Sequence, residues 1–74
     1  EDKITEVRIQ SAWEKVMGRQ IHTLTEKIVF KDHSLTIYLR SAPLREELSM
    51  ARTRIMELIN KEVGSQAVRE IILR

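Results

Sequence analysis

The fold is decided by the stretch KIVFKDHSLTIYLR, residues Lys27–Arg40, which alternates apolar and polar side chains on both sides of a short polar link. Its inward apolar set is Ile28, Phe30, Leu35, Ile37 and Leu39. A period of two is typical of half-buried strands. The link Asp32-His33-Ser34 contains residues that tolerate a left-handed backbone. The stretch therefore predicts an antiparallel hairpin with one apolar face that helices must cover.

The length and composition indicate one small folded domain, residues 1–74. A chain of this size buries only about 60% of the surface that it exposes when unfolded. With 42% hydrophobic and 32% charged residues, two glycines and one proline, it is neither disordered nor of low complexity. The absence of cysteine fits a reducing compartment, so we expect a cytoplasmic protein. No apolar run approaches the roughly 20 residues of a membrane span, so no membrane partner is expected.

An amphipathic helix is predicted before the hairpin, from Ile4 to about Thr23. Its apolar stripe is Ile9, Trp13, Val16, Met17 and Ile21. We expect Trp13 to anchor the core rather than to stack on a ligand, because its helical neighbours are aliphatic. Gly18 interrupts the run, and the sequence leaves open a C-cap, a kink or a close approach of two backbones.

A second helix is predicted from Pro43 to Val63, since proline suits a first helical turn and Gly64 suits a C-cap. Its stripe is Leu44, Leu48, Ala51, Ile55, Leu58 and Ile59. The final residues 65–74 predict a third strand with Ile71 and Leu73 inward and Ile72 outward. A right-handed crossover makes this strand parallel to the second. The expected fold is α+β, in the order α-β-β-α-β, with two helices on one face of a three-stranded sheet.

Signatures of catalysis and of bound cofactors are missing from the sequence. His22 and His33 lie in different elements without the spacing of a metal site. No serine lies in a nucleophile elbow, and no nucleophile is visibly paired with a base. Two isolated glycines form neither a phosphate loop nor a G-x-x-G clamp. We therefore expect no enzyme, metal, cofactor or small-molecule substrate.

The outer face of the hairpin is the first candidate binding surface. Lys27, Lys31, Tyr38 and Arg40 point away from the helices in this interpretation, so basic residues flank an exposed aromatic ring. Such surfaces hold single-stranded nucleic acids by stacking and charge. The alternative is an ordinary solvated sheet face whose basic residues discourage edge association. The four residues are the predicted DNA-binding set.

The long second helix carries the second candidate surface. Arg45, Arg52 and Arg54 are interleaved with glutamates, a pattern that usually marks a solvated face. Met50 and Met56 fall beside the buried stripe, where a methionine serves either adaptable protein contacts or packing at the edge of the core. The pattern alone does not choose between these roles.

Four motifs in order give the chain a family resemblance. They are Trp13-x-x-Val16-x-Gly18, Leu35-x-Ile37-x-Leu39-x-Ser41, Leu44-Arg45-x-Glu47-Leu48 and Val63-Gly64. Together they resemble the DciA-type proteins, bacterial operators of the DnaB replicative helicase, over nearly the whole chain. The resemblance implies a KH-like α+β domain, which matches the element order derived above. The motif residues themselves look structural.

The resemblance also implies a function in DNA replication. It implies a non-enzymatic adaptor that binds the replicative DnaB-type helicase, has DNA affinity of its own and helps to place the helicase on DNA. Together with the exposed surface of the predicted second helix, the family resemblance predicts that the helicase contacts Arg45, Arg52 and Met56. Two alternatives stay open, an RNA-binding KH-like module and a structural oligomerisation domain. Because the chain stops at its last predicted strand, we expect it to be a fragment of something longer. Members of the family commonly carry a helix before the position of Ile4, and some carry a long basic tail after the domain. If loading depends on either segment, this chain is expected to bind the helicase without loading it.

Overall fold

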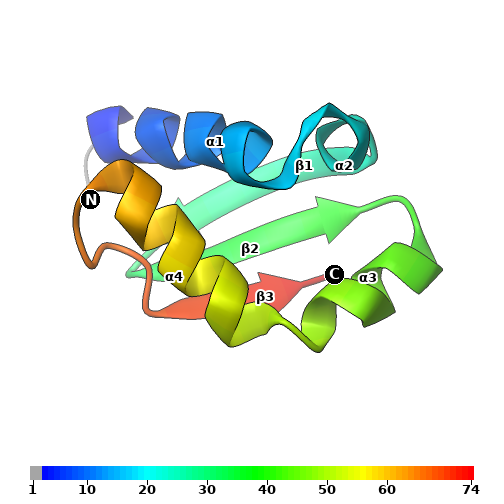
Figure 1. Cartoon of the computed structure of the whole chain (residues 1–74). Helices are drawn as coiled ribbons and strands as arrows, with labels where there is room; N and C mark the ends of the chain where they lie inside the picture. Colours follow the sequence, from blue (N-terminus) through cyan, green and yellow to red (C-terminus); the bar gives the residue numbers. More distant parts are fainter. Residues whose placement is uncertain (1–2) are drawn as a thin grey trace.

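The computed structural model describes residues 3–74 and has helices packed over a three-stranded sheet (Figure 1). The elements are α1 (Lys3–Met17), α2 (Arg19–Thr23), β1 (Thr25–Lys31), β2 (Ser34–Leu39), α3 (Ala42–Ser49), α4 (Arg52–Val63) and β3 (Glu70–Leu73). The sheet order is β1-β2-β3. β1 is antiparallel to β2, and β3 is parallel to β2. The predicted α+β class, the order of the three strands and the main helices along the chain, and the strand directions are confirmed.

The hairpin turns through two residues, Asp32 and His33, with φ angles of 52° and 65°. Both residues adopt left-handed backbone, the requirement of a type I′ turn whose twist matches that of the strands. Lys31 then pairs with Ser34, so Ser34 belongs to β2 rather than to the turn. The register places Phe30 beside Leu35 on the buried face, as the alternation predicts.

The first helical segment is not continuous to Thr23, because Gly18 separates α1 from α2. Gly18 has φ of 93° and ψ of 164°, a backbone conformation that L side chains rarely adopt. No atom lies within 4 Å of the place where a Cβ would stand, so close backbone approach does not explain this glycine. The break redirects the chain so that α2 leads into β1. Of the three possibilities, Gly18 is a kink between α1 and α2.

The predicted helix from Pro43 to Val63 is likewise two helices. Ser41 caps α3 by accepting a hydrogen bond from the Leu44 N–H at 3.2 Å. At the other end, Met50 and Ala51 donate to carbonyls three residues back, which tightens the last turn and ends α3. A new helix starts when the Ile55 N–H donates to Ala51. The apolar stripe continues through the bend, which is why periodicity alone indicated one helix.

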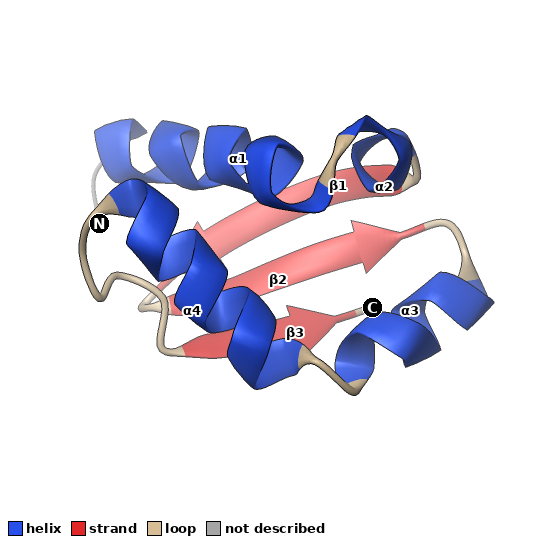
Figure 2. Ribbon diagram, in the orientation of Figure 1, coloured by secondary structure: helices blue, strands red, loops and turns tan. Residues whose placement is uncertain are grey.

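The two bends allow the helices to cover one face of the sheet and its ends. α1 and α4 contact each other and lie on the same face of the sheet, while α3 contacts β2 and β3 (Figure 2). The opposite face of the strands has no helix over it in this view. The expectation of helices on one face of the sheet is therefore confirmed, with α1 and α4 as the main cover, and the structure adds α2 and α3 as short connecting helices.

The core is a single apolar cluster between these helices and the sheet. Its buried members are Ile9, Ala12, Trp13, Phe30, Leu35, Ile37, Leu39, Leu48, Ile55, Ile59, Val68 and Ile71. Trp13 is fully buried, as predicted. Its indole Nε1–H donates to Thr25 Oγ1 at 2.9 Å, and that hydroxyl donates to the Ile21 carbonyl at 2.9 Å. One buried side chain thus links α1, α2 and the start of β1.

Asn60 is the buried polar residue among those described, and it fixes the segment that precedes β3. Its Nδ2 donates to the Val68 carbonyl, and its Oδ1 accepts from the Val68 N–H, each at 2.9 Å. The side-chain amide thereby satisfies both main-chain groups of a fully buried residue. This pairing determines where β3 begins relative to α4.

Replacing Trp13 by alanine is expected to lower the free energy of unfolding by about 3 to 5 kcal/mol, because it leaves a large cavity and removes the Thr25 hydrogen bond. Denaturant unfolding followed by circular dichroism measures the change. Met50→Ala is the matched control, since Met50 is 80% exposed. An unchanged midpoint for Trp13→Ala would contradict the placement of Trp13 at the centre of the core.

Replacing Asn60 by alanine is expected to lower the free energy of unfolding by about 2 to 6 kcal/mol, because each of the two buried main-chain groups of Val68 left without a partner costs about 1 to 3 kcal/mol. The neighbouring Lys61→Ala removes an exposed side chain and should change stability by no more than about 0.5 kcal/mol. Equal unfolding midpoints for the two variants would show that the Asn60 amide does not hold β3 in place.

Candidate functional site

The uncovered face of the sheet contains cross-strand rows of side chains set by the register. Lys27 of β1 pairs with Tyr38 of β2. Thr36 lies between Val29 on β1 and Ile72 on β3, and Ser34 lies between Lys31 and Glu70. Directly paired residues project from the same face of a sheet. The predicted residues Lys27, Lys31 and Tyr38 therefore do share one face.

Tyr38 is the aromatic centre of this face. The Lys27 Nζ lies 4.9 Å from the centroid of the Tyr38 ring, within the range of a cation–π contact. Such a contact contributes about 0.5 to 1 kcal/mol at an exposed site. Lys27 is exposed and Tyr38 is half-buried, so part of the Tyr38 side chain remains accessible to solvent. The contact holds a cation beside the ring before any ligand arrives.

Arg74 follows β3 and lies across the ladder from Tyr38, and it is not among the site residues predicted from the sequence. The Arg74 N–H donates to the Ile37 carbonyl at 2.9 Å, and its carbonyl accepts from the Leu39 N–H at 2.8 Å. These two bonds bracket Tyr38, so the parallel ladder of β2 and β3 continues to a Tyr38–Arg74 pair. The exposed Arg74 joins the row Lys27–Tyr38–Arg74, one residue from each strand or its extension. We call this row the tyrosine row.

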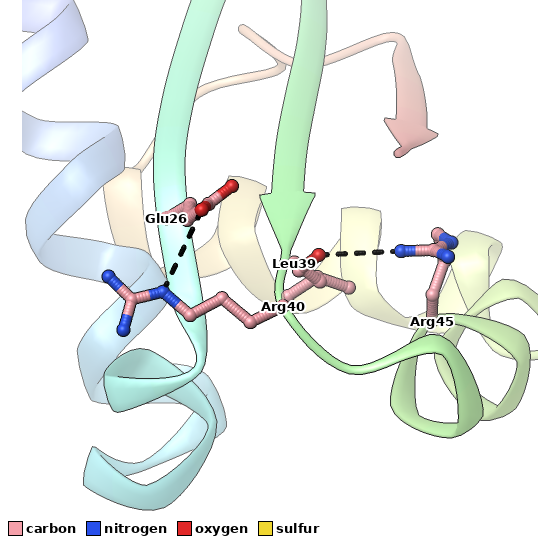
Figure 3. A network of polar contacts seen from close by, with 4 residues as sticks. All are labelled: Glu26, Leu39, Arg40 and Arg45. Atoms are coloured by element: carbon pink, nitrogen blue, oxygen red, sulfur yellow. Dashed lines mark hydrogen bonds and ion pairs between the residues drawn. The ribbon is translucent and has the colours of Figure 1, made fainter.

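Arg40 lies at the same end of the sheet but belongs to its rim. Its Nε is 3.9 Å from a Glu26 carboxylate oxygen, with the two side chains 61% and 58% exposed. Figure 3 shows Arg40 reaching from the end of β2 across β1 toward Glu26. Glu26 lies at the irregularity in the β1–β2 register between Thr25 and Lys27. An ion pair this exposed is weak, so Arg40 can exchange Glu26 for another anion.

Lys31 lies at the opposite end of the face, four residues from Lys27 along β1, or about 13 Å at the rise of a strand. The cross-strand row of Lys31 contains charges of both signs, because Ser34 pairs with Lys31 on one side and with the exposed Glu70 on the other. Ser34 Oγ also donates a hydrogen bond to Glu70 Oε1 at 2.6 Å. The structure thus brings Lys27, Tyr38 and Arg40 to one end and leaves Lys31 apart. Positive charge is concentrated around the tyrosine row.

The residues predicted for helicase contact do not form one surface. Arg45 is on α3, half-buried, and its Nη1 donates to the Leu39 carbonyl at 3.4 Å, closing the end of β2 (Figure 3). Arg52 and Met56 are one turn apart on α4. They line a groove of about 480 Å³ between the first turns of α4 and residues 69–73 of the chain. Arg45 is separated from this pair because the predicted long helix is broken at residues 50–51.

No cluster of three or more potential metal ligands occurs among residues 3–74. His33 is in the hairpin turn, where its Nδ1–H donates to the Ala67 carbonyl at 2.9 Å, and His22 is on α2. The two histidines are thus in separate elements, as the sequence predicts. Within the same described range, no helix is long and apolar enough to cross a membrane.

Comparison with known proteins identifies one family over almost the whole length. The family model described as “Dna[CI] antecedent, DciA” matches residues 1–73. No curated protein and no solved structure matches the chain. The match covers the three strands and α4, and it stops one residue before Arg74 of the tyrosine row.

Proposed function

The chain belongs to the DciA family, and from this premise we propose that it is a non-enzymatic adaptor of DNA replication. It binds the replicative DnaB-type helicase and DNA in the cytoplasm and assists helicase loading. Family membership supports the replication role. The tyrosine row is the observation that supports DNA binding, and the groove on α4 supports a separate protein contact.

DNA binds the tyrosine row as a single strand in this proposal. An unpaired base has a free face that can stack on an aromatic ring, whereas a paired base in a duplex does not. Lys27 Nζ lies over the Tyr38 ring, and Arg74 pairs with Tyr38 through the strand ladder, so both residues are placed to neutralise phosphates near a stacked base. Arg40 extends the positive charge at the rim once it leaves Glu26. Lys31 adds a more distant phosphate contact.

The helicase contact is assigned to the α4 groove with Arg52 and Met56. Arg52 is exposed and is available to steer an approaching partner, while the half-buried Met56 offers a soft apolar anchor. Arg45 contributes less to the helicase contact, because its guanidinium already donates a hydrogen bond to the Leu39 carbonyl. DNA and helicase therefore use different surfaces, and both can be bound at once.

For DNA, replacing Lys27 and Lys31 together by glutamine should weaken binding and reduce the slope of log affinity against log salt. The reduction is at most about 1.4 to 1.8, because each phosphate contact contributes about 0.7 on single strands and 0.9 on duplex. Tyr38→Ala should instead lower affinity by about 1 to 3 kcal/mol with little change of slope, because stacking releases no counterions. Fluorescence anisotropy with a labelled oligothymidine at several salt concentrations measures both quantities.

The matched control replaces Lys3 and Lys61, two exposed lysines on α1 and α4, by glutamine. It makes the same change of net charge away from the tyrosine row and should leave the slope nearly unchanged. If the control lowers the slope as much as the Lys27 and Lys31 variant does, DNA contacts the helical face instead. A tighter complex with the matching oligouridine would favour the RNA-binding alternative.

For the helicase, Arg52→Glu should slow association, while Met56→Ala should speed dissociation. Exposed charges mostly set the rate of encounter, whereas buried apolar anchors set the lifetime of a complex. Surface plasmon resonance with immobilised cognate helicase separates the two rate constants, and titration should extend from micromolar to millimolar concentrations.

Arg8→Glu on α1 provides the control for Arg52→Glu, because both residues are exposed and on helices. The proposal requires that Arg8→Glu change the association rate by less than Arg52→Glu does. Absence of binding by the unaltered chain, when a longer chain with its flanking segments binds, would place the helicase contact outside these residues.

A further inference from the structure

β3 forms one of the two edges of the sheet, and among the described residues the side of it that faces away from β2 is unpaired. The N–H and C=O of Arg74 point toward β2. Because these groups alternate sides along a strand, those of Ile71 and Leu73 point away from β2. Within β3 the charged residue is Glu70, and neither proline nor lysine, which most often discourage strand pairing, occurs there.

The α4 groove runs along this same edge. Its lining comes from Arg52, Thr53 and Met56 on one side and from residues 69–73 on the other. A volume of about 480 Å³ is within the range of sites that hold a short peptide segment or a small ligand. In a strand added along β3, every second side chain would point into the groove toward Met56. The side chains between them would point toward the rim of the groove.

Charge indicates what kind of segment fits. Arg52 and Arg69 both line the groove, and neither takes part in the ion pairs of residues 3–74. Glu70 is the acidic residue of the lining, and its Oε1 already accepts from Ser34. A second copy of the chain would bring another Arg52 and Arg69 into a shared groove, which like-charge repulsion disfavours. A segment with carboxylates would instead pair with both guanidinium groups.

We infer that the β3 edge and the α4 groove bind an extended acidic segment of a partner protein by strand addition, with carboxylates on Arg52 and Arg69 and an apolar side chain against Met56. This inference rests on the proposed function, since it takes that partner to be the helicase. It specifies the form of the contact, main-chain hydrogen bonds to Ile71 and Leu73. A helix lying on α4 would make no such bonds.

The test measures the Kd of the cognate DnaB-type helicase for the unaltered chain and two variants. One variant carries an N-methyl group on the Leu73 nitrogen, introduced by chemical synthesis, which removes the outward donor and keeps the side chain. The other is the Arg52→Ser, Arg69→Ser double variant, with Arg8→Ser, Arg19→Ser as its charge-matched control on α1 and α2. Thermal unfolding by circular dichroism verifies that each form is folded.

Each groove variant should raise the Kd by at least about tenfold, and the control by less than about twofold. Amide exchange at Ile71 and Leu73 should also slow in the complex. If the unaltered chain binds and both groove variants bind equally well, strand addition is wrong while the helicase contact stands. If the unaltered chain does not bind, the helicase contact and this inference both fail. Self-association that N-methylation of Leu73 abolishes would assign the edge to a second copy and overturn the acidic segment.

Discussion

The paired hydrogen bonds between the Asn60 side chain and the main chain of Val68 are the constraint on which the arrangement of both surfaces depends. They tie the carboxyl-terminal half of α4 to the segment that enters β3. Since Val68 is buried, both of its main-chain groups lose their hydrogen-bond partner if the amide is removed. With β3 fixed in register, Arg74 lies beside Tyr38, and the free edge of β3 lies along Arg52 and Met56.

β3 consequently takes part in both proposed surfaces. Its extension at Arg74 completes the tyrosine row on the uncovered face, while its outer edge forms one wall of the α4 groove. The bends at Gly18 and at residues 50–51 make this division possible, because they keep α1 and α4 on one face and leave the other face to the strands. A DNA strand and a protein segment can thus approach neighbouring parts of one small sheet.

The hairpin, the burial of Trp13 and the parallel third strand were predictable because each follows from local periodicity or from the handedness of a crossover. The broken helices were not, because the apolar stripe from Leu44 to Ile59 continues through the bend at Met50. Asn60 lies next to Ile59 on a helix and gives no sign in sequence that its amide faces Val68. Arg74 was missed for a related reason, since its position beside Tyr38 depends on the register of two strands that are far apart in the chain. Lys27 and Tyr38 were found together because the hairpin turn alone fixes their pairing.

The central claim, that single-stranded DNA binds the uncovered sheet face around Tyr38, is tested most directly by titrating the isotope-labelled chain with an oligothymidine and following its amide and side-chain NMR signals. The tyrosine row predicts that the largest shifts occur at Lys27, Tyr38 and Arg74, with Arg40 next and the exposed residues of α1 and α4 nearly unchanged. Shifts centred on Arg52, Met56 and Arg69 would contradict the claim, because they would place the nucleic acid in the groove assigned to protein.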